Sequence, residues 1–88
     1  MNDNEIRNAI LEFAYNKAKE AGIIEEGGRF TNHEISKLKG LEGIEKNIID
    51  FNIDYLEKKG LIKWDATKGK TAITIEGIDE YERIHKHE

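Results

Sequence analysis

The basic residues of this 88-residue chain are concentrated in two short stretches, and their chemistry is suited to binding phosphate. The whole chain carries a net charge of −4, yet residues 29–39 carry +2 and residues 58–70 carry +4. The remaining segments, 1–28, 40–57 and 71–88, are each negative. Lysine and arginine neutralise phosphates and release counterions, which drives the binding of nucleic acids. The distribution of charge therefore favours a polyanion partner, although the net charge alone argues against one.

Few residues have the type and spacing needed for covalent or metal chemistry. The chain has no cysteine, which excludes disulfides, thiolate metal sites and thiol nucleophiles. Ser36 is the only serine and has no base arranged beside it. His85 and His87 have a spacing that allows a shared metal, but no further ligand accompanies them. Glycines occur at no phosphate-loop or dinucleotide spacing. We therefore expect no enzyme, no metal and no organic cofactor.

Apolar spacing and capping residues predict the helices that must position the basic residues. A first helix is expected over residues 4–21, ending at Gly22, with Ile23 folding back on it. A short second helix is expected from Thr31. Thr31 and Glu34 form a capping box, in which the side chain of each residue bonds to the backbone N–H of the other. Phe30 and Ile35 supply a hydrophobic staple at that start, and Leu38 also points inward before the helix ends ahead of Gly40. A polar, glycine-containing loop at 25–28 is expected to join the two helices.

The third helix is expected over residues 44–59 and is followed by a change of apolar period. Ile49, Ile53 and Leu56 lie at i, i+4 and i+7, which places them on one helical face. Gly60 has the left-handed position that ends a helix. An alternating pattern then predicts a β-hairpin with its tip at 66–70.

The hairpin is expected to place Trp64 on its inner face and to continue alternating as far as Ile75. Thr74 can cap a final helix, with Ile73 and Ile78 at the staple positions. Tyr81 and Ile84 would complete the buried side of that helix.

This order of elements resembles the winged helix-turn-helix superfamily over nearly the whole chain. Three segments carry the resemblance: residues 34–38, 49–62 and 73–78. The second is similar to the third helix and wing entry of MarR- and ArsR-type regulators. The resemblance implies an α+β domain spanning 1–88, with a three-helix bundle, a β-hairpin wing and a C-terminal helix.

The resemblance further implies a transcriptional regulator that binds double-stranded DNA. The third helix would enter the major groove, the second would cross the backbone, and the wing would reach a flanking phosphate or the minor groove. The base-reading positions would be Lys46, Asn47, Asp50 and Phe51. The backbone contacts around the second helix would come from Arg29, Thr31, Asn32, His33 and Lys37, and those of the wing from Lys63, Lys68 and Lys70.

Such a regulator would present one reading head per chain. Specific binding would therefore require a homodimer, expected through the first or the fourth helix. No apolar run is long enough to cross a membrane, and the acidic, polar start does not resemble a secretory signal. We expect a cytoplasmic protein.

Two features favour a different use of the same scaffold. The turn at 40–43 is longer than the family's usual turn, and Asp50 and Asp54 on the third helix would repel phosphates. Ile48, Phe51 and Tyr55 either pack as core against the first and fourth helices or form a surface for a protein partner. For the basic wing, the alternative to nucleic-acid contact is a solubilising hairpin that protects an edge strand. A protein-interaction or dimerisation module is therefore the alternative to DNA binding.

Overall fold

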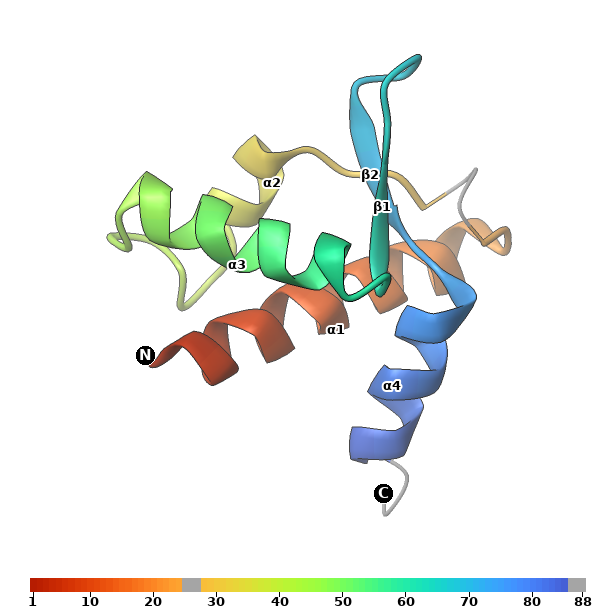
Figure 1. Cartoon of the computed structure of the whole chain (residues 1–88), viewed down its shortest axis with the longest axis horizontal. Helices are drawn as coiled ribbons and strands as arrows, with labels where there is room; N and C mark the ends of the chain where they lie inside the picture. Colours follow the sequence, from red (N-terminus) through yellow and green to blue (C-terminus); the bar gives the residue numbers. More distant parts are fainter. Residues whose placement is uncertain (25–27, 86–88) are drawn as a thin grey trace.

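The computed structural model describes residues 1–24 and 28–85, which form four helices and one antiparallel β-hairpin (Figure 1). In chain order the elements are α1 (Asp3–Ala21), α2 (Asn32–Ser36), α3 (Lys46–Lys58), β1 (Ile62–Asp65), β2 (Lys70–Ile73) and α4 (Ile75–His85). The expected α+β class is therefore confirmed. Most of the loop predicted at 25–28, together with His87, lies outside the described residues.

The first two helices begin where the capping residues predict. Asn2 accepts a hydrogen bond from the Glu5 amide at 2.8 Å, and the Glu5 carboxylate accepts one from the Asn2 amide at 2.9 Å. Thr31 and Glu34 make the same reciprocal pair at the start of α2. Each pair satisfies amides that have no partner within the helix, which fixes the residue at which it starts. At the other end of α1, Gly22 has the expected left-handed conformation, with φ of 72°.

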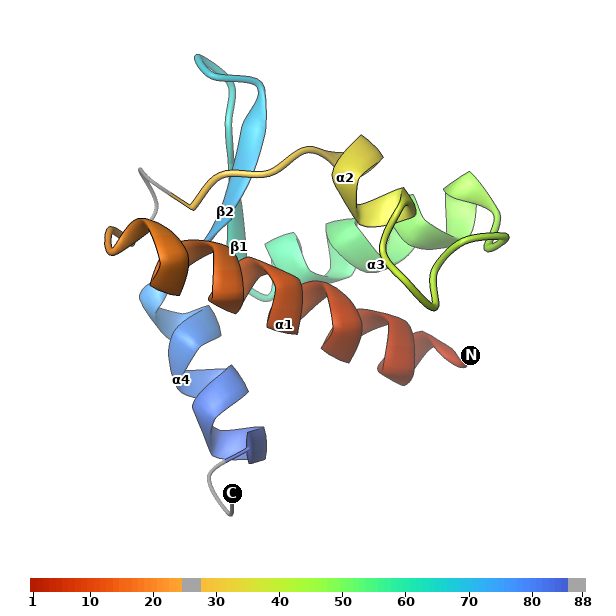
Figure 2. The same cartoon turned by 180° about the vertical axis from the view of Figure 1, so that it is seen from behind.

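The core lies where α1 crosses beneath α3 and the hairpin (Figure 2). Phe30 and Ile35, the predicted staple of α2, are both completely buried. Phe13 of α1 meets the Phe30 ring edge-on, with centroids 5.5 Å apart. From α3, the predicted face is buried, and it consists of Ile49, Ile53 and Leu56.

The hairpin pairs Ile62 with Ile73, Lys63 with Ala72, Trp64 with Thr71 and Asp65 with Lys70. Phe30 extends this sheet by one residue, because its backbone exchanges two hydrogen bonds with Thr71, of 2.7 and 2.8 Å. Paired residues point to the same face of a sheet. Phe30, Ile62 and Ile73 therefore share the face that enters the core.

The base of the hairpin is attached to the start of α4 through Thr74. Its hydroxyl donates to the Gly60 carbonyl at 2.6 Å and accepts from the Gly77 amide at 3.0 Å. Its own amide donates to the Leu61 carbonyl at 3.1 Å. The predicted cap of the last helix is confirmed, and the same residue also holds the end of α3.

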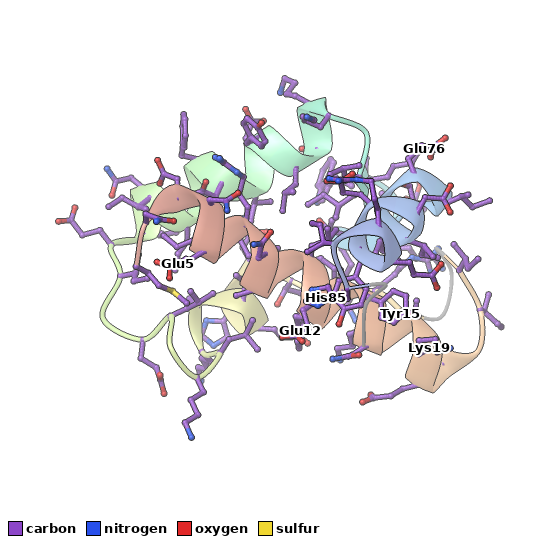
Figure 3. The ribbon with its side chains drawn as sticks, turned by 90° about the horizontal axis from the view of Figure 1, so that it is seen from below. Glu5, Glu12, Tyr15, Lys19, Glu76 and His85 are labelled. Carbon is purple, nitrogen blue, oxygen red and sulfur yellow. The ribbon has the colours of Figure 1, made fainter. Side chains whose placement is uncertain are left out.

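Helix α4 packs on α1 through a short aromatic stack. Tyr15 of α1 stacks on Tyr81 of α4, with centroids 4.3 Å apart and ring planes inclined at 26°, and the centroid of the His85 ring lies 4.2 Å from that of Tyr81. Figure 3 shows Tyr15 and His85 close together on this side of the molecule. The stack orients the last helix against the first.

Several predicted positions are wrong. Trp64 is 51% exposed instead of lying inside, because the hairpin projects beyond the helices and the core ends at Thr71 and Phe30 (Figure 1). Ile75 starts α4 instead of extending the strand, and it is exposed. Ile23 is exposed and does not fold back on α1 as a buried contact, and Ile84 is also exposed.

The outer side of α3 settles one alternative that the sequence left open. Phe51 is 60% exposed, and Ile48 and Tyr55 are also classed among the exposed large side chains. The interpretation of these three residues as core is therefore wrong. Together they form an apolar strip on the outer side of α3. No helix within the described residues is long and apolar enough to cross a membrane.

Candidate nucleic-acid interface

A groove of about 240 Å³ lies between the N-terminal ends of α2 and α3. The capping box at Thr31 sets where α2 begins, and the turn before α3 is anchored by the fully buried Leu41. The groove is lined by Asn32, His33, Ser36, Ile44, Lys46, Ile49 and Asp50. Four of the predicted contact residues are therefore brought together here: Asn32, His33, Lys46 and Asp50.

The charges of this groove are compensated within the protein. The Lys46 ammonium lies 2.6 Å from one Asp50 oxygen, and the Asn32 amide donates to the other Asp50 oxygen at 3.3 Å. Farther along α3, Lys58 pairs in the same way with Asp54 at 2.7 Å. The hydrogen bond from Lys58 to Asp54, and the charge of Asp54, raise the pKa of Lys58 above its ordinary value.

Helix α3 consequently carries no positive excess. Its two lysines stand against three carboxylates, so its net charge is −1. A phosphate that approached Lys46 would have to displace Asp50 from it. The surface of α3 is therefore poorly suited to attract a polyanion by charge alone.

The outer face of the hairpin forms a second hollow, of about 370 Å³. The pairing of Lys63 with Ala72 and of Asp65 with Lys70 puts these four residues on the face opposite to the core. Arg29 joins them, because its neighbour Phe30 is bonded to β2. The small side chain of the buried Ala72 forms the floor between longer side chains.

Three cations surround this second hollow, with one carboxylate among them. Arg29 lies 3.4 Å from Asp65. Among the described residues, no carboxylate lies within ion-pair distance of Lys63 or Lys70, and both side chains are exposed. At the tip, Asp65 also accepts bonds from the Thr67 and Lys68 amides, so this carboxylate is shared among several donors. The hollow therefore offers positive charge that the protein itself leaves uncompensated.

The structure thus divides the predicted DNA-binding residues instead of gathering all of them. The cations of the hairpin lie on the sheet face that points away from the core, and no residue lines both hollows. Thr31 acts as a helix cap and is half-buried. The remaining predicted residues are exposed and line neither hollow: Lys37, Asn47, Phe51 and Lys68.

Asn52 helps to position α3, and its burial was not predicted because asparagine is a polar residue. Asn52 is completely buried on α3 and accepts from the Arg7 guanidinium at 3.1 Å. Its amide donates to Asp3 at 3.2 Å and to the Ile48 carbonyl at 2.9 Å. These bonds tie α3 to the start of α1. The helical projection places Asn52 beside the buried Leu56, at the edge of the apolar face, which was the signal available in the sequence.

The exposed lysines of the hairpin are suited to binding anions. Within residues 1–24 and 28–85, no group of three or more histidine and carboxylate side chains could hold a metal ion. Comparisons with protein-family models, with curated proteins and with solved structures found no match. The function must therefore be argued from the two surfaces themselves.

Proposed function

We propose that the chain is a winged helix-turn-helix that binds double-stranded DNA and acts in transcriptional control. The observation that carries the proposal is the hollow of the hairpin, where Lys63 and Lys70 lie beside Ala72 and, among the described residues, no carboxylate is within ion-pair distance of either lysine. This cationic surface belongs to a chain whose net charge is −4. Lysines without ion-pair partners on a projecting hairpin are well placed to contact a phosphate backbone.

In this proposal most of the affinity comes from the sugar-phosphate backbone. The hairpin lysines would neutralise phosphates, while the groove between α2 and α3 would lie at the edge of the major groove. Asn47 projects to the outside of α3 and is able to bond to adenine. Lys46 would first have to leave Asp50, which makes base reading by α3 weak. Specific binding would then need a second copy of the chain, through α1 or α4.

The test is a fluorescence-anisotropy titration with a labelled random-sequence duplex at two salt concentrations. Three neutralised phosphates give a logarithmic salt slope of about −2.7, so affinity should fall roughly 40-fold between about 50 and 200 mM salt. An absence of binding at the lower salt concentration would contradict the proposal.

Charge reversal on the hairpin locates the contact. The double variant Lys63→Glu with Lys70→Glu should lose affinity by at least about tenfold while its thermal midpoint stays unchanged. The matched control is Lys19→Glu with Lys59→Glu, which changes the net charge equally at exposed positions outside both hollows. Equal losses in both variants would mean that only the overall charge matters and that the hairpin is not the contact.

A second candidate function rests on the exposed apolar strip of α3. Phe51 is 60% exposed and is accompanied by Ile48 and Tyr55, on a helix whose net charge is negative. Such a strip is better suited to burial against another protein than to contact with phosphates. If the duplex fails to bind at low salt, the protein partner becomes the favoured reading, and Phe51→Ser should then abolish that association without affecting the fold.

A further inference from the structure

A third hollow, of about 380 Å³, lies among α1, the C-terminal end of α3 and α4. Helices α1 and α4 lie on the side of the molecule away from the hairpin tip (Figure 1). The hollow is independent of both surfaces described above, since no residue that lines it lines either of them. Its volume is within the range of pockets that bind small molecules.

Cations from three different helices converge on this hollow. The Arg7 guanidinium of α1 lies 4.0 Å from the centroid of the Tyr55 ring, and the Lys59 ammonium lies 5.8 Å from the same centroid. Arg83 of α4 also lines the hollow. Among the described residues, Glu80 is the only carboxylate in the lining, so three positive charges of this part of the chain stand against one negative charge.

The carboxylate of Glu80 is already bonded to Arg83. Glu80 accepts two hydrogen bonds from Arg83, at 2.6 and 3.1 Å. These bonds hold the pKa of Glu80 below its ordinary value, with further contributions from the charges of Arg83 and Lys59. Among the described residues, neither Arg7 nor Lys59 has a carboxylate within ion-pair distance. Two cations beside this hollow therefore have no ion-pair partner among the described residues.

The walls of the hollow add apolar surface to this charge. Leu11 and Leu56 are buried beneath it, and Leu61 and Ile84 contribute more exposed apolar surface. Arg7 cannot turn away freely, because Asn52 accepts a hydrogen bond from it at 3.1 Å. One cation is thus held in place, and a second, flexible one lies over the same aromatic ring.

We propose that this hollow binds a small organic anion, with its anionic head at Arg7 and Lys59 and a compact apolar body against Leu61 and Ile84. Guanidinium and ammonium groups recognise both carboxylates and phosphates, so the anion is either a carboxylate or a phosphate monoester. The ligand would bridge α1, α3 and α4. The proposal does not depend on DNA binding.

The test is an NMR titration of the ¹⁵N-labelled chain at constant ionic strength with three probes: phenyl phosphate, benzoate and inorganic phosphate. Saturable shifts are expected at amides near 4–11, 55–61 and 80–84. Because the apolar body adds contact, phenyl phosphate should bind at least about fivefold more tightly than inorganic phosphate. The relative affinities of benzoate and phenyl phosphate decide which anion is preferred. Shifts that do not saturate, or that are spread over the whole surface, would overturn the proposal.

Two substitutions at adjacent positions test the site directly. Lys59→Gln should weaken binding of the tighter organic probe by about tenfold, since it removes one of the two cations that have no ion-pair partner among the described residues. Lys58→Gln is the control, because Lys58 is paired with Asp54 and does not line the hollow. Equal affinities in both variants would refute the site. Both residues are exposed, and a thermal melt verifies that both variants are folded. Since no step uses DNA, failure here leaves the duplex titration unaffected, and the reverse also holds.

Discussion

Helix α3 and the hairpin carry their lysines in opposite ways. On α3, Lys46 and Lys58 each have an aspartate four residues away, at 2.6 and 2.7 Å. On the hairpin, Lys63 and Lys70 have no such partner among the described residues. The number of lysines on an element therefore does not measure the charge that it offers to a ligand. In the proposed DNA complex, the hairpin lysines would attract the phosphates electrostatically, and α3 would contribute by its fit to the major groove.

The two regions are also held in place differently. The hairpin is fixed at its base by the Thr74 hydroxyl, which donates to the Gly60 carbonyl and accepts from the Gly77 amide. Helix α3 is fixed by bonds between side chains, since Asn52 bonds to Asp3 and Arg7 of α1. Substitutions can therefore disturb either region separately.

The largest expected effect is at the base of the hairpin. In Gly77→Ala the added methyl group would clash with the Leu61 carbonyl and lie 2.7 Å from an Ile73 side-chain carbon. We expect the free energy of unfolding to fall by about 3 kcal/mol, because neither the backbone nor a packed isoleucine can move away easily. Chemical denaturation measures this change.

Gly69→Ala is the control for that prediction. Gly69 has φ of 66°, and a methyl group there would meet nothing within 4 Å. Only the left-handed backbone is penalised, at about 1 kcal/mol. Equal losses in the two variants would show that close packing at Gly77 is not what fixes the hairpin.

The next effect concerns the position of α3. Asn52→Ala leaves the Arg7 and Asp3 side chains without their buried partner, so we expect a loss of about 2 kcal/mol in the free energy of unfolding. Asn47→Ala, on the exposed side of the same helix, should change stability by less than about 0.5 kcal/mol. A similar result for both variants would exclude Asn52 as the residue that seats α3.

A smaller effect is expected from a double substitution that removes the difference in charge between α3 and the hairpin. Asp50→Asn with Asp54→Asn releases Lys46 and Lys58, so affinity for a random duplex at low salt should rise by about tenfold. The control, Glu20→Gln with Asp79→Asn, removes two negative charges at exposed positions on α1 and α4 and should change affinity less. If the two variants gain equally, the compensation on α3 is irrelevant to binding.

The smallest effect tests what a compensated surface pair contributes. Arg83 lowers the pKa of Glu80, so the ionised carboxylate stabilises the folded state above its unfolded pKa of about 4.3. This contribution is lost as pH falls through the lower folded-state pKa. The thermal midpoint of the native chain should therefore exceed that of Glu80→Gln by no more than about 2 °C at pH near 6, and the difference should vanish near pH 3. A difference that grows with acidity would reverse the assigned sign.

Much of the fold could be predicted because its signals are local. The capping box of Thr31 with Glu34 and the apolar face of Ile49 and Ile53 are each contained within a few residues. Trp64 was misplaced because alternation gives the face of a strand but not the distance over which the core covers it.

The candidate site was less predictable because its geometry depends on contacts between distant segments. The sequence identified the hairpin lysines, but Arg29 reaches them only through the pairing of Phe30 with Thr71. The partner of Lys46 is four residues away, a spacing at which ion pairs are common on helices, so this compensation was in principle readable. Asn52 combines a polar side chain with a buried position, and only the partners on α1 explain it.

The pairing of Phe30 with Thr71 has a consequence for the order of folding. The β-hairpin and α1 are each stabilised by contacts between residues that are close in the sequence, so both can form early in folding. The bond between Phe30 and Thr71 must bring together two segments with α2 and α3 between them, so it costs more loop-closure entropy than the pairing within the hairpin. We expect the amides of these two residues to exchange with solvent only through global opening, which would make them reporters of the rate at which the whole molecule unfolds.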